Sequence, residues 1–253
     1  MKCPKCGSTH IDQYRMVTGA IWCVDCKYRV EQKEVYNPFA IEIMTKEVDL
    51  LTEYLGKRGE WRDVADSANT TVNKEHGTKE PSSEWKRKML FCEHSPIRQM
   101  NFKFIWKNLK YWISVHLVRH KFGIEHFVRS QRTDRTGVNR DVLPQSALVE
   151  HEICVNAQAL INISRKRLCR KASKETREAW EGLLKTLYDK DREVWSACVP
   201  ECVYRNGLCP EFKSCGWNKT DDFKTRLMEY TGMLSGQICD YTNIFLNKSL
   251  WDG

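Results

Sequence analysis

The segment RHKFGIEHFVRSQR, which occupies residues 119–132, is the part of the chain from which the rest can be interpreted. Five of residues 119–135 are Arg or Lys and two are His, yet the segment directly follows the largely apolar run 111–118. A basic cluster joined to a core element costs desolvation free energy unless a multiply charged anion binds to it. Arg offers two-pronged hydrogen bonds to phosphate, and His adds a donor that titrates near neutral pH. These residues therefore predict a site for a phosphate-bearing ligand.

A second polar pattern, NAQALINISRKR, occupies residues 156–167 within a stretch that we expect to be helical. Its polar residues include Asn156, Asn162 and Arg167. Read alone, the two asparagines are equally compatible with buried side chains that satisfy their own hydrogen bonds and with contacts to a ligand.

Together these segments resemble the flavin-dependent thymidylate synthases, the ThyX family. The family has an R-H-R-x(7 or 8)-S-x-R signature, which is similar to residues 119–121 followed, after eight residues, by 130–132. It also has an N-A-R-x-L-x-N-F-L-x-L-R helix, which is similar to residues 156–167. The turn at His94-Ser95-Pro96 is similar to a turn that contacts FAD in that family. The chain departs from the family where Phe127-Val128 replaces Asn-Glu, where Thr133 replaces Tyr and where Gln158 replaces the first helix Arg.

The resemblance implies an α+β fold, a homotetramer with active sites built between subunits, and reductive methylation of dUMP to dTMP. FAD would be the cofactor, with methylenetetrahydrofolate and NADPH as co-substrates. It implies catalytic roles for Arg167, Ser130 and Arg132, with Arg167 stabilising negative charge on the uracil ring. The implied nucleotide contacts are His116, Ser130, Gln131, Arg132 and Arg167. The implied flavin contacts are His94, Ser95, Arg119, His120, Lys121, Asn156 and Asn162.

The first 34 residues form a separate unit by their cysteine spacing. Cys3-x2-Cys6 and Cys23-x2-Cys26 have the spacing of a zinc ribbon, in which four thiolates close a tetrahedron around Zn²⁺. So short a unit has little core of its own, so the metal would supply its folding free energy. We expect a structural zinc ribbon at 1–34, a catalytic domain at 35–220 and a C-terminal extension at 221–253.

A second group of cysteines falls in a loop-rich span with unusual spacing. Cys198, Cys202, Cys209 and Cys215 are compatible either with a second zinc site or with separate buried thiols. The remaining cysteines are expected to be isolated core or surface thiols; they are Cys92, Cys154, Cys169 and Cys239.

Hydrophobic periodicity, together with capping and helix-breaking residues, predicts the elements that carry these motifs. We expect a helix from Asn37 that continues through Leu55, a polar loop over 60–83, a helix from Glu84, and a half-buried strand over 100–107. Further predictions are a helix over 109–118, a strand over 126–133, a long helix over 145–169, a helix from Ser173 and a helix over 223–230.

The net charge of +8 suits a polyanionic partner, either phosphorylated small molecules or nucleic acid. We find no signal peptide and no apolar run of membrane-spanning length, so we expect a cytoplasmic protein without membrane contact. Two alternatives remain open. One is a flavin-dependent enzyme that modifies C5 of a pyrimidine nucleotide differently, for example by hydroxymethylation. The other is a zinc-ribbon protein that binds nucleic acid; the ribbon could equally contact nucleic acid or protein as a module of an enzyme.

Overall fold

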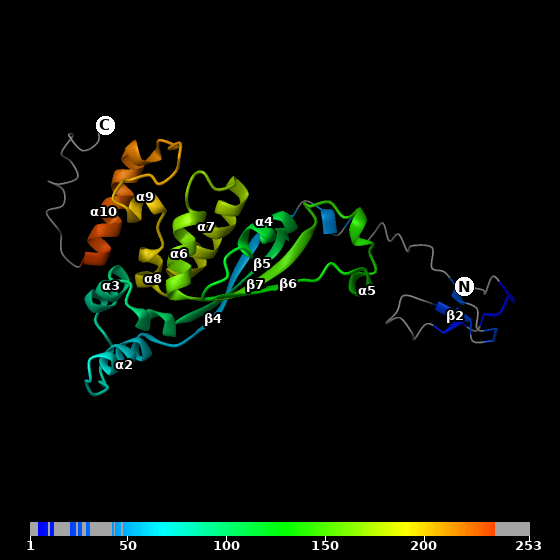
Figure 1. Cartoon of the computed structure of the whole chain (residues 1–253), viewed down its shortest axis with the longest axis horizontal. Helices are drawn as coiled ribbons and strands as arrows, with labels where there is room; N and C mark the ends of the chain where they lie inside the picture. Colours follow the sequence, from blue (N-terminus) through cyan, green and yellow to red (C-terminus); the bar gives the residue numbers. More distant parts are fainter. Residues whose placement is uncertain are drawn as a thin grey trace.

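A computed structural model of the chain describes residues 48–235 without a break (Figure 1). Ahead of them it describes only 5–9, 11–12, 21–23, 25–26, 29–30, 42 and 44–46. Within the described residues, no helix combines the length and the apolar character needed to cross a bilayer.

The N-terminal pieces form a small antiparallel sheet of β1 (Ile11–Asp12), β2 (Ile21–Cys23) and β3 (Arg29–Val30) in that order. Cys6 and Cys26 each lie in a turn, and a hydrogen bond from Ser8 to Asp25 joins the two turns. Cys3 and the side chain of Cys23 lie outside the described residues, so the zinc ribbon stays a prediction.

The main body is built on a four-stranded sheet in the order β4-β5-β7-β6, in which every neighbouring pair is antiparallel. Its strands are β4 (Leu51–Arg58), β5 (Asn101–Lys110), β7 (Leu148–Asn156) and β6 (Ile124–Val128). Helices accompany the sheet, so the expected mixture of helix and antiparallel sheet is confirmed.

One face of this sheet carries the core. Phe102, Phe104 and Trp106 alternate along β5 and are fully buried, as strand periodicity requires. The Trp106 indole donates to the Ala179 carbonyl at 2.9 Å, which ties the sheet to α7 (Lys174–Tyr188). Helices α4 (Tyr111–Leu117) and α6 (Ala157–Arg167) also pack on the sheet (Figure 1). The opposite face carries ion pairs, including Lys103 to Glu152 at 2.9 Å.

Two expectations for the region before β5 are wrong. Residues 51–58 form β4 rather than the end of a helix, because backbone pairing with β5 outweighs the helical spacing of its leucines. Residues 61–71 form α2 (Trp61–Thr71) rather than loop. A reciprocal cap between Glu60 and Asp63 begins that helix, and buried Trp61 and Val64 anchor it.

The long helix expected over 145–169 is also wrong in its first half. Residues 148–156 form β7, in which Val149, His151, Ile153 and Val155 alternate inward. The helix begins only at Ala157, where Asn156 caps it. Likewise the strand expected over 126–133 is shorter and shifted, since β6 ends at Val128 and Ser130 and Arg132 follow it.

Several other predictions are confirmed. Helix α3 (Ser83–Phe91), strand β5 and helix α7 with its Ser173 cap lie where the periodicity placed them, and the helix expected over 109–118 is the shorter α4. The helix expected over 223–230 is the longer α10 (Asp221–Ser235), whose Phe223, Leu227 and Tyr230 join the core. The remaining short elements are η2 (Ser95–Gln99), α5 (Thr133–Thr136), η3 (Arg140–Val142), α8 (Arg192–Ala197), α9 (Glu201–Tyr204) and η4 (Trp217–Lys219).

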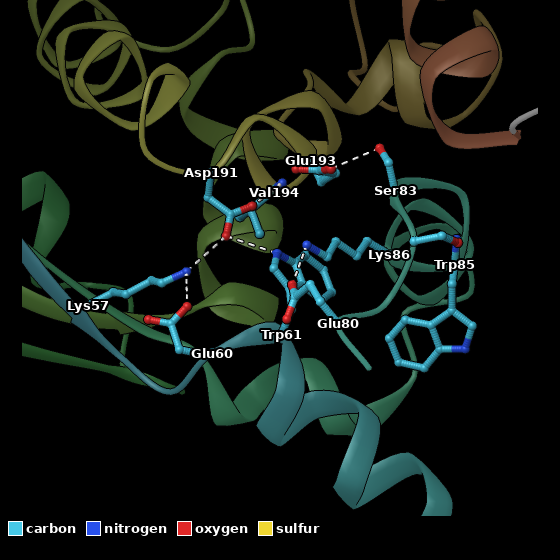
Figure 2. Close-up of polar contacts among 11 residues, drawn as sticks. Lys57, Glu60, Trp61, Glu80, Ser83, Trp85, Lys86, Asp191, Glu193 and Val194 are labelled. Carbon is cyan, nitrogen blue, oxygen red and sulfur yellow. Dashed lines mark hydrogen bonds and ion pairs between the residues drawn. The ribbon is translucent and has the colours of Figure 1, made fainter. Parts of the chain in front are cut away.

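A buried carboxylate joins the start of α2 to the helices above the sheet. Asp191 receives the Trp61 indole N–H at 3.1 Å and caps α8 through the Val194 N–H at 3.1 Å. Figure 2 shows the Lys57 ammonium reaching from the end of β4 to both Asp191, at 3.5 Å, and Glu60, at 2.7 Å. Burial raises the pKa of the Asp191 carboxyl, against the opposing effect of the Val194 N–H and Lys57. These contacts of Asp191 fix the position of the end of β4, an edge strand of the sheet, relative to α8.

Candidate functional site

The Arg119 pocket, as we call it, lies between the loop that follows α4 and one face of α6, and it encloses about 250 Å³. Its lining consists of Arg119, His120, Lys121, Phe122, Ala159, Asn162 and Ile163. Four predicted flavin contacts, Arg119, His120, Lys121 and Asn162, are therefore brought together. Ala159 and Ile163 supply an apolar wall, and the Phe122 ring is 91% exposed at the edge of the pocket.

Arg167 does not line this pocket but contacts it through His120. Its Nε donates to His120 Nε2 at 2.9 Å, and its Nη2 donates to the His116 carbonyl oxygen at 2.5 Å. An imidazole nitrogen that accepts from a guanidinium must carry a lone pair, so His120 is neutral with its proton on Nδ1. Burial, reinforced by the charge of Arg167, lowers the pKa of His120 to about 4. The ring N–H at Nδ1 is then the donor that His120 can offer to a ligand.

The pocket carries a cluster of positive charge from Arg119 and Lys121, with Arg167 close by. Among the described residues, no carboxylate forms an ion pair with Arg119, Lys121 or Arg167. Burial, and after it the like charge of Arg119, lowers the pKa of the Arg167 guanidinium. Clustered cations without carboxylate partners favour binding of an anion, which relieves their mutual repulsion.

A chain of histidines connects the pocket to the core. His126 Nε2 lies 2.9 Å from the His120 carbonyl oxygen and must donate to it, so Nδ1 of a neutral His126 ring accepts. The donor to His126 Nδ1 is then His151 Nε2, at 2.9 Å. His151 is fully buried, and its Nδ1 has no hydrogen-bond partner. Burial, with the adjacent His126 as a smaller cause, lowers the pKa of His151 to about 4.

A second polar network fixes Asn162. Its Oδ1 accepts from Arg165 Nη1 at 3.2 Å and from Gln158 Nε2 at 3.5 Å. Gln158 also donates to Glu93 at 2.6 Å, and Arg165 forms a short ion pair with the same carboxylate. With its oxygen engaged in this way, Asn162 offers its amide N–H groups as donors.

Asn156 has a structural role that the sequence did not reveal. Its Oδ1 caps α6 by accepting from the Ala159 N–H at 2.8 Å, and its own N–H donates to the Gly123 carbonyl at 2.8 Å. Gly123 has a φ of +71°, and a Cβ there would lie 2.5 Å from the Asn156 amide nitrogen. A glycine at 123 is therefore needed for the pocket loop to approach the start of α6.

The other predicted residues lie apart from this pocket. Ser130, Gln131 and Arg132 follow the far end of β6, whose five residues span roughly 16 Å at about 3.3 Å per residue. Arg132 is exposed and forms two hydrogen bonds to Asp134, both at 2.9 Å. His94 and Ser95 are exposed at the start of η2 and do not line the pocket. His116 lies on α4, with its Nδ1 3.0 Å from the Thr176 hydroxyl.

Comparison with known proteins gives structural likeness only. No protein-family model and no curated protein matches the sequence. Among solved structures, the chain is similar to the UMP/dUMP methylase PolB from Streptomyces cacaoi bound with 5-Br dUMP, at 14% identity and a TM-score of 0.48, over 60% of this chain and 95% of that one. It is also similar to the flavin dependent thymidylate synthase ThyX from Helicobacter pylori complexed with FAD and dUMP, at 14% identity and a TM-score of 0.49, over 58% of this chain and 99% of that one. A second structure of that synthase with FAD and dUMP gives 15% identity and a TM-score of 0.49, over 60% and 99%. At TM-scores below 0.5, these likenesses establish neither a shared family nor a shared ligand.

Proposed function

We propose that the chain is a flavin-dependent enzyme that modifies C5 of a pyrimidine nucleotide, by reductive methylation of dUMP to dTMP with methylenetetrahydrofolate and NADPH. The observation that carries this proposal is the Arg119 pocket, in which uncompensated cations surround a neutral imidazole beside an oriented amide. The motifs that resemble the flavin-dependent thymidylate synthases supply its two cations, Arg119 and Lys121, and its amide, Asn162. They also supply Arg167, which donates to His120.

The residues of the pocket fit a flavin dinucleotide. Arg119 and Lys121 would bind its phosphates, while His120 and Asn162 would donate hydrogen bonds to it. Phe122 and Ile163 offer apolar surface to a ring. Bound there, FAD would supply the redox and one-carbon relay chemistry, and this chain's residues would bind, orient and exclude water. Asn156 would support flavin binding indirectly, by fixing the start of α6. We also propose that Asn156, His94 or Ser95 contacts the flavin directly.

The nucleotide would be bound by a second copy of the chain together with the first. A pocket of about 250 Å³ is smaller than the roughly 300–1,000 Å³ typical of small-molecule sites, so one subunit encloses only part of the ligands. Ser130, Gln131 and Arg132 lie at the opposite end of β6 and would reach the pocket of a neighbour in a homotetramer. Arg132 would then exchange Asp134 for the nucleotide phosphate. Arg167 would stabilise negative charge on the uracil ring, with His116 beside it.

The first test is the visible absorption spectrum of the purified protein, followed by titration with dUMP. We expect flavin absorption bands that shift when dUMP binds. Lys121→Ala is expected to lower the flavin content, whereas Lys171→Ala, an equal change of charge at an exposed residue outside the pocket, is expected to leave it unchanged. A protein that is colourless and does not take up added FAD would overturn the proposal.

The product of turnover separates the alternatives. Formation of dTMP from dUMP, methylenetetrahydrofolate and NADPH supports methylation, whereas a hydroxymethylated nucleotide would support the first alternative. The hydroxymethylation alternative stays open because Phe127-Val128 replaces the Asn-Glu of the flavin-dependent thymidylate synthases. The carboxylate that is lost would lie next to the bound nucleotide. A colourless protein whose binding to DNA or RNA weakens steeply with salt would instead support the nucleic-acid alternative.

A further inference from the structure

Four cysteines from separate parts of the sequence line one small cavity, which we call the cysteine pocket. They are Cys169, just after α6, Cys202 in α9, and Cys209 and Cys215 in the loop that follows α9. The cavity measures about 10 Å³, which is about the space of one water molecule or one small ion. The pocket lies outside the nucleotide site, and no step of the proposed reaction uses it.

The four cysteines of this pocket differ by one residue from the four that the sequence analysis grouped as a possible second zinc site. Cys198, which the sequence grouped with Cys202, Cys209 and Cys215, is buried and does not line the cavity. Its thiol interacts with the Ser164 hydroxyl instead, and burial raises its pKa to about 12. Cys169, which the sequence treated as an isolated thiol, takes the fourth place because α6 ends beside α9.

The electrostatics of the pocket show that its sulfur atoms interact with one another. Burial, with the nearby Cys169 and Cys215 as smaller causes, raises the pKa of the Cys202 thiol to about 11. Burial likewise raises the pKa of Cys169, with Glu211, Cys215 and Cys209 as smaller causes in the same direction. Cys169 and Cys202 therefore each lie within electrostatic reach of at least two other cysteines of the pocket.

The loop that carries two of these cysteines is held near its start by hydrogen bonds, including one from Asn218 to the Gly207 carbonyl at 2.8 Å, but buries few apolar side chains. Residues 205–216 contain no helix or strand, and Asn206, Gly207 and Gly216 all have positive φ values, of 52°, 94° and 80°. Leu208 is 73% exposed and the Phe212 side chain is fully exposed, so the loop gains little from apolar burial. A loop of this length without its own core requires another anchor.

We propose that the cysteine pocket binds a structural Zn²⁺ ion through Cys169, Cys202, Cys209 and Cys215. Four thiolates are the ligand set of closed structural zinc sites, and a soft thiolate shell selects such a metal over Mg²⁺ or Ca²⁺. Among the described residues, no three His, Cys, Asp or Glu side chains are already gathered as a metal's ligand shell. The ion would therefore draw Cys209 and Cys215 inward with their loop, so that metal binding stabilises the loop.

The charges around the pocket are mixed. Arg170 lines the cavity and lies over the Trp217 ring at 5.0 Å, and its charge would oppose the excess negative charge of a four-thiolate zinc site. Glu211 also lines the cavity and acts in the opposite sense. Glu201 is already paired with Arg205 at 2.6 Å and with Lys166 at 3.2 Å, so it adds little free charge.

The test is the zinc and iron content of the full-length protein and its variants, measured by elemental analysis. In a Cys6→Ser/Cys26→Ser background, which removes two of the four predicted ribbon ligands and which we call ribbon-free, we expect one zinc per chain to remain. Adding Cys209→Ser/Cys215→Ser should remove it, whereas adding Cys92→Ser/Cys154→Ser, at two cysteines outside the pocket, should not. Unchanged zinc in the Cys209/Cys215 variant, or no zinc in the ribbon-free background, would overturn the proposal.

Two further measurements keep the test independent of folding. Cobalt substituted into the ribbon-free protein should give the visible bands of tetrahedral cobalt bound to thiolates, and the Cys209/Cys215 change should abolish them while helix content by circular dichroism persists. Chelation of the metal from the same protein should speed tryptic cleavage in the 205–216 loop, where Lys213 lies. Iron with acid-labile sulfide in place of zinc, or a disulfide between pocket cysteines in the purified protein, would each overturn the zinc assignment.

Discussion

His120 combines a position at the ligand pocket with a ring that burial keeps uncharged. The hydrogen bond from Arg167 needs the lone pair on His120 Nε2, and protonation would place a charged ring against a guanidinium. His151 is neutral for a related reason, because it is fully buried and, among the described residues, its ring hydrogen-bonds to another histidine, His126, and to no carboxylate. At neutral pH the His120 ring can therefore orient Arg167 without adding positive charge.

Stability should fall as the pH is lowered through the titration of these two histidines. Each has a pKa of about 4 in the folded protein against 6.5 when unperturbed, so below pH 6.5 the unfolded state binds more protons. Their stabilising contribution is fully present above pH 6.5 and is lost as the pH falls towards 4. The expected slope is up to about 1.4 kcal/mol per pH unit for each histidine.

Urea denaturation followed by tryptophan fluorescence at several pH values between 7.5 and 4.5 measures this slope. The control is His151→Gln, which keeps a donor towards His126 but cannot titrate, and whose free energy of unfolding should depend less steeply on pH. An identical pH dependence in the variant and the original protein would contradict the assignment to His151.

At the scale of elements, the pocket depends on how the loop after α4 meets the start of α6. Gly123 has no side chain, so its backbone can lie close to Asn156, and the Asn156 side chain in turn caps α6. The same contact places Phe122 and Lys121 opposite Ala159 and Asn162. The cap of α6 and the shape of the pocket therefore depend on the same contact between Gly123 and Asn156.

Gly123→Ala is predicted to be more destabilising than Gly137→Ala. Both glycines have φ near +70°, so an alanine costs about 1–2 kcal/mol of backbone strain at either position. Only at Gly123 would the new Cβ also collide with Asn156, at 2.5 Å, and with Ala159, at 3.0 Å, which adds about 1–3 kcal/mol. Thermal or urea unfolding of the two variants gives the difference, and equal losses would refute the packing argument.

At the scale of the whole molecule, the two groups of predicted ligand residues stand at opposite ends of β6. The Arg119 pocket precedes this strand and Ser130–Arg132 follow it, with β6 paired along its length to β7. A rigid strand pair prevents the two ends from meeting around one small ligand within a chain. In the homo-oligomer that we propose, the far end of one copy would lie beside the pocket of another and so overcome this limit.

Co-expression of two inactive variants tests this arrangement. When Arg119→Ala chains assemble at random with Arg132→Ala chains, about a quarter of the shared sites should combine two intact halves and recover activity. Arg119→Ala mixed with Lys121→Ala is the control, because both changes affect the same half and no site recovers. Activity should be measured on complexes purified through a different tag on each chain, and a lack of recovery in the first mixture would exclude a shared site.

The amino-acid sequence by itself determined the chemistry more fully than the elements that carry it. The basic residues of 119–132 predicted an anion site, because hydrogen-bonding capacity and charge are properties of the side chains themselves. Asn162 was added to it only by the family resemblance. Alternation likewise predicted β5, and capping at Ser173 predicted α7, because both signals are local. Strands β4 and β7 were misread as helix because leucines and valines permit either period, and pairing with β5 made the choice.

Only the tertiary structure decided which distant residues meet. It brought His126 to His151 across two strands, exchanged Cys198 for Cys169 in the cysteine pocket, and separated Ser130 and Arg132 from the Arg119 pocket. It also made Asn156 a helix cap, since that role depends on where β7 ends and α6 begins. The physical reason is the same in each case: contacts between residues far apart in sequence depend on strand register and helix packing, which composition and spacing do not encode locally.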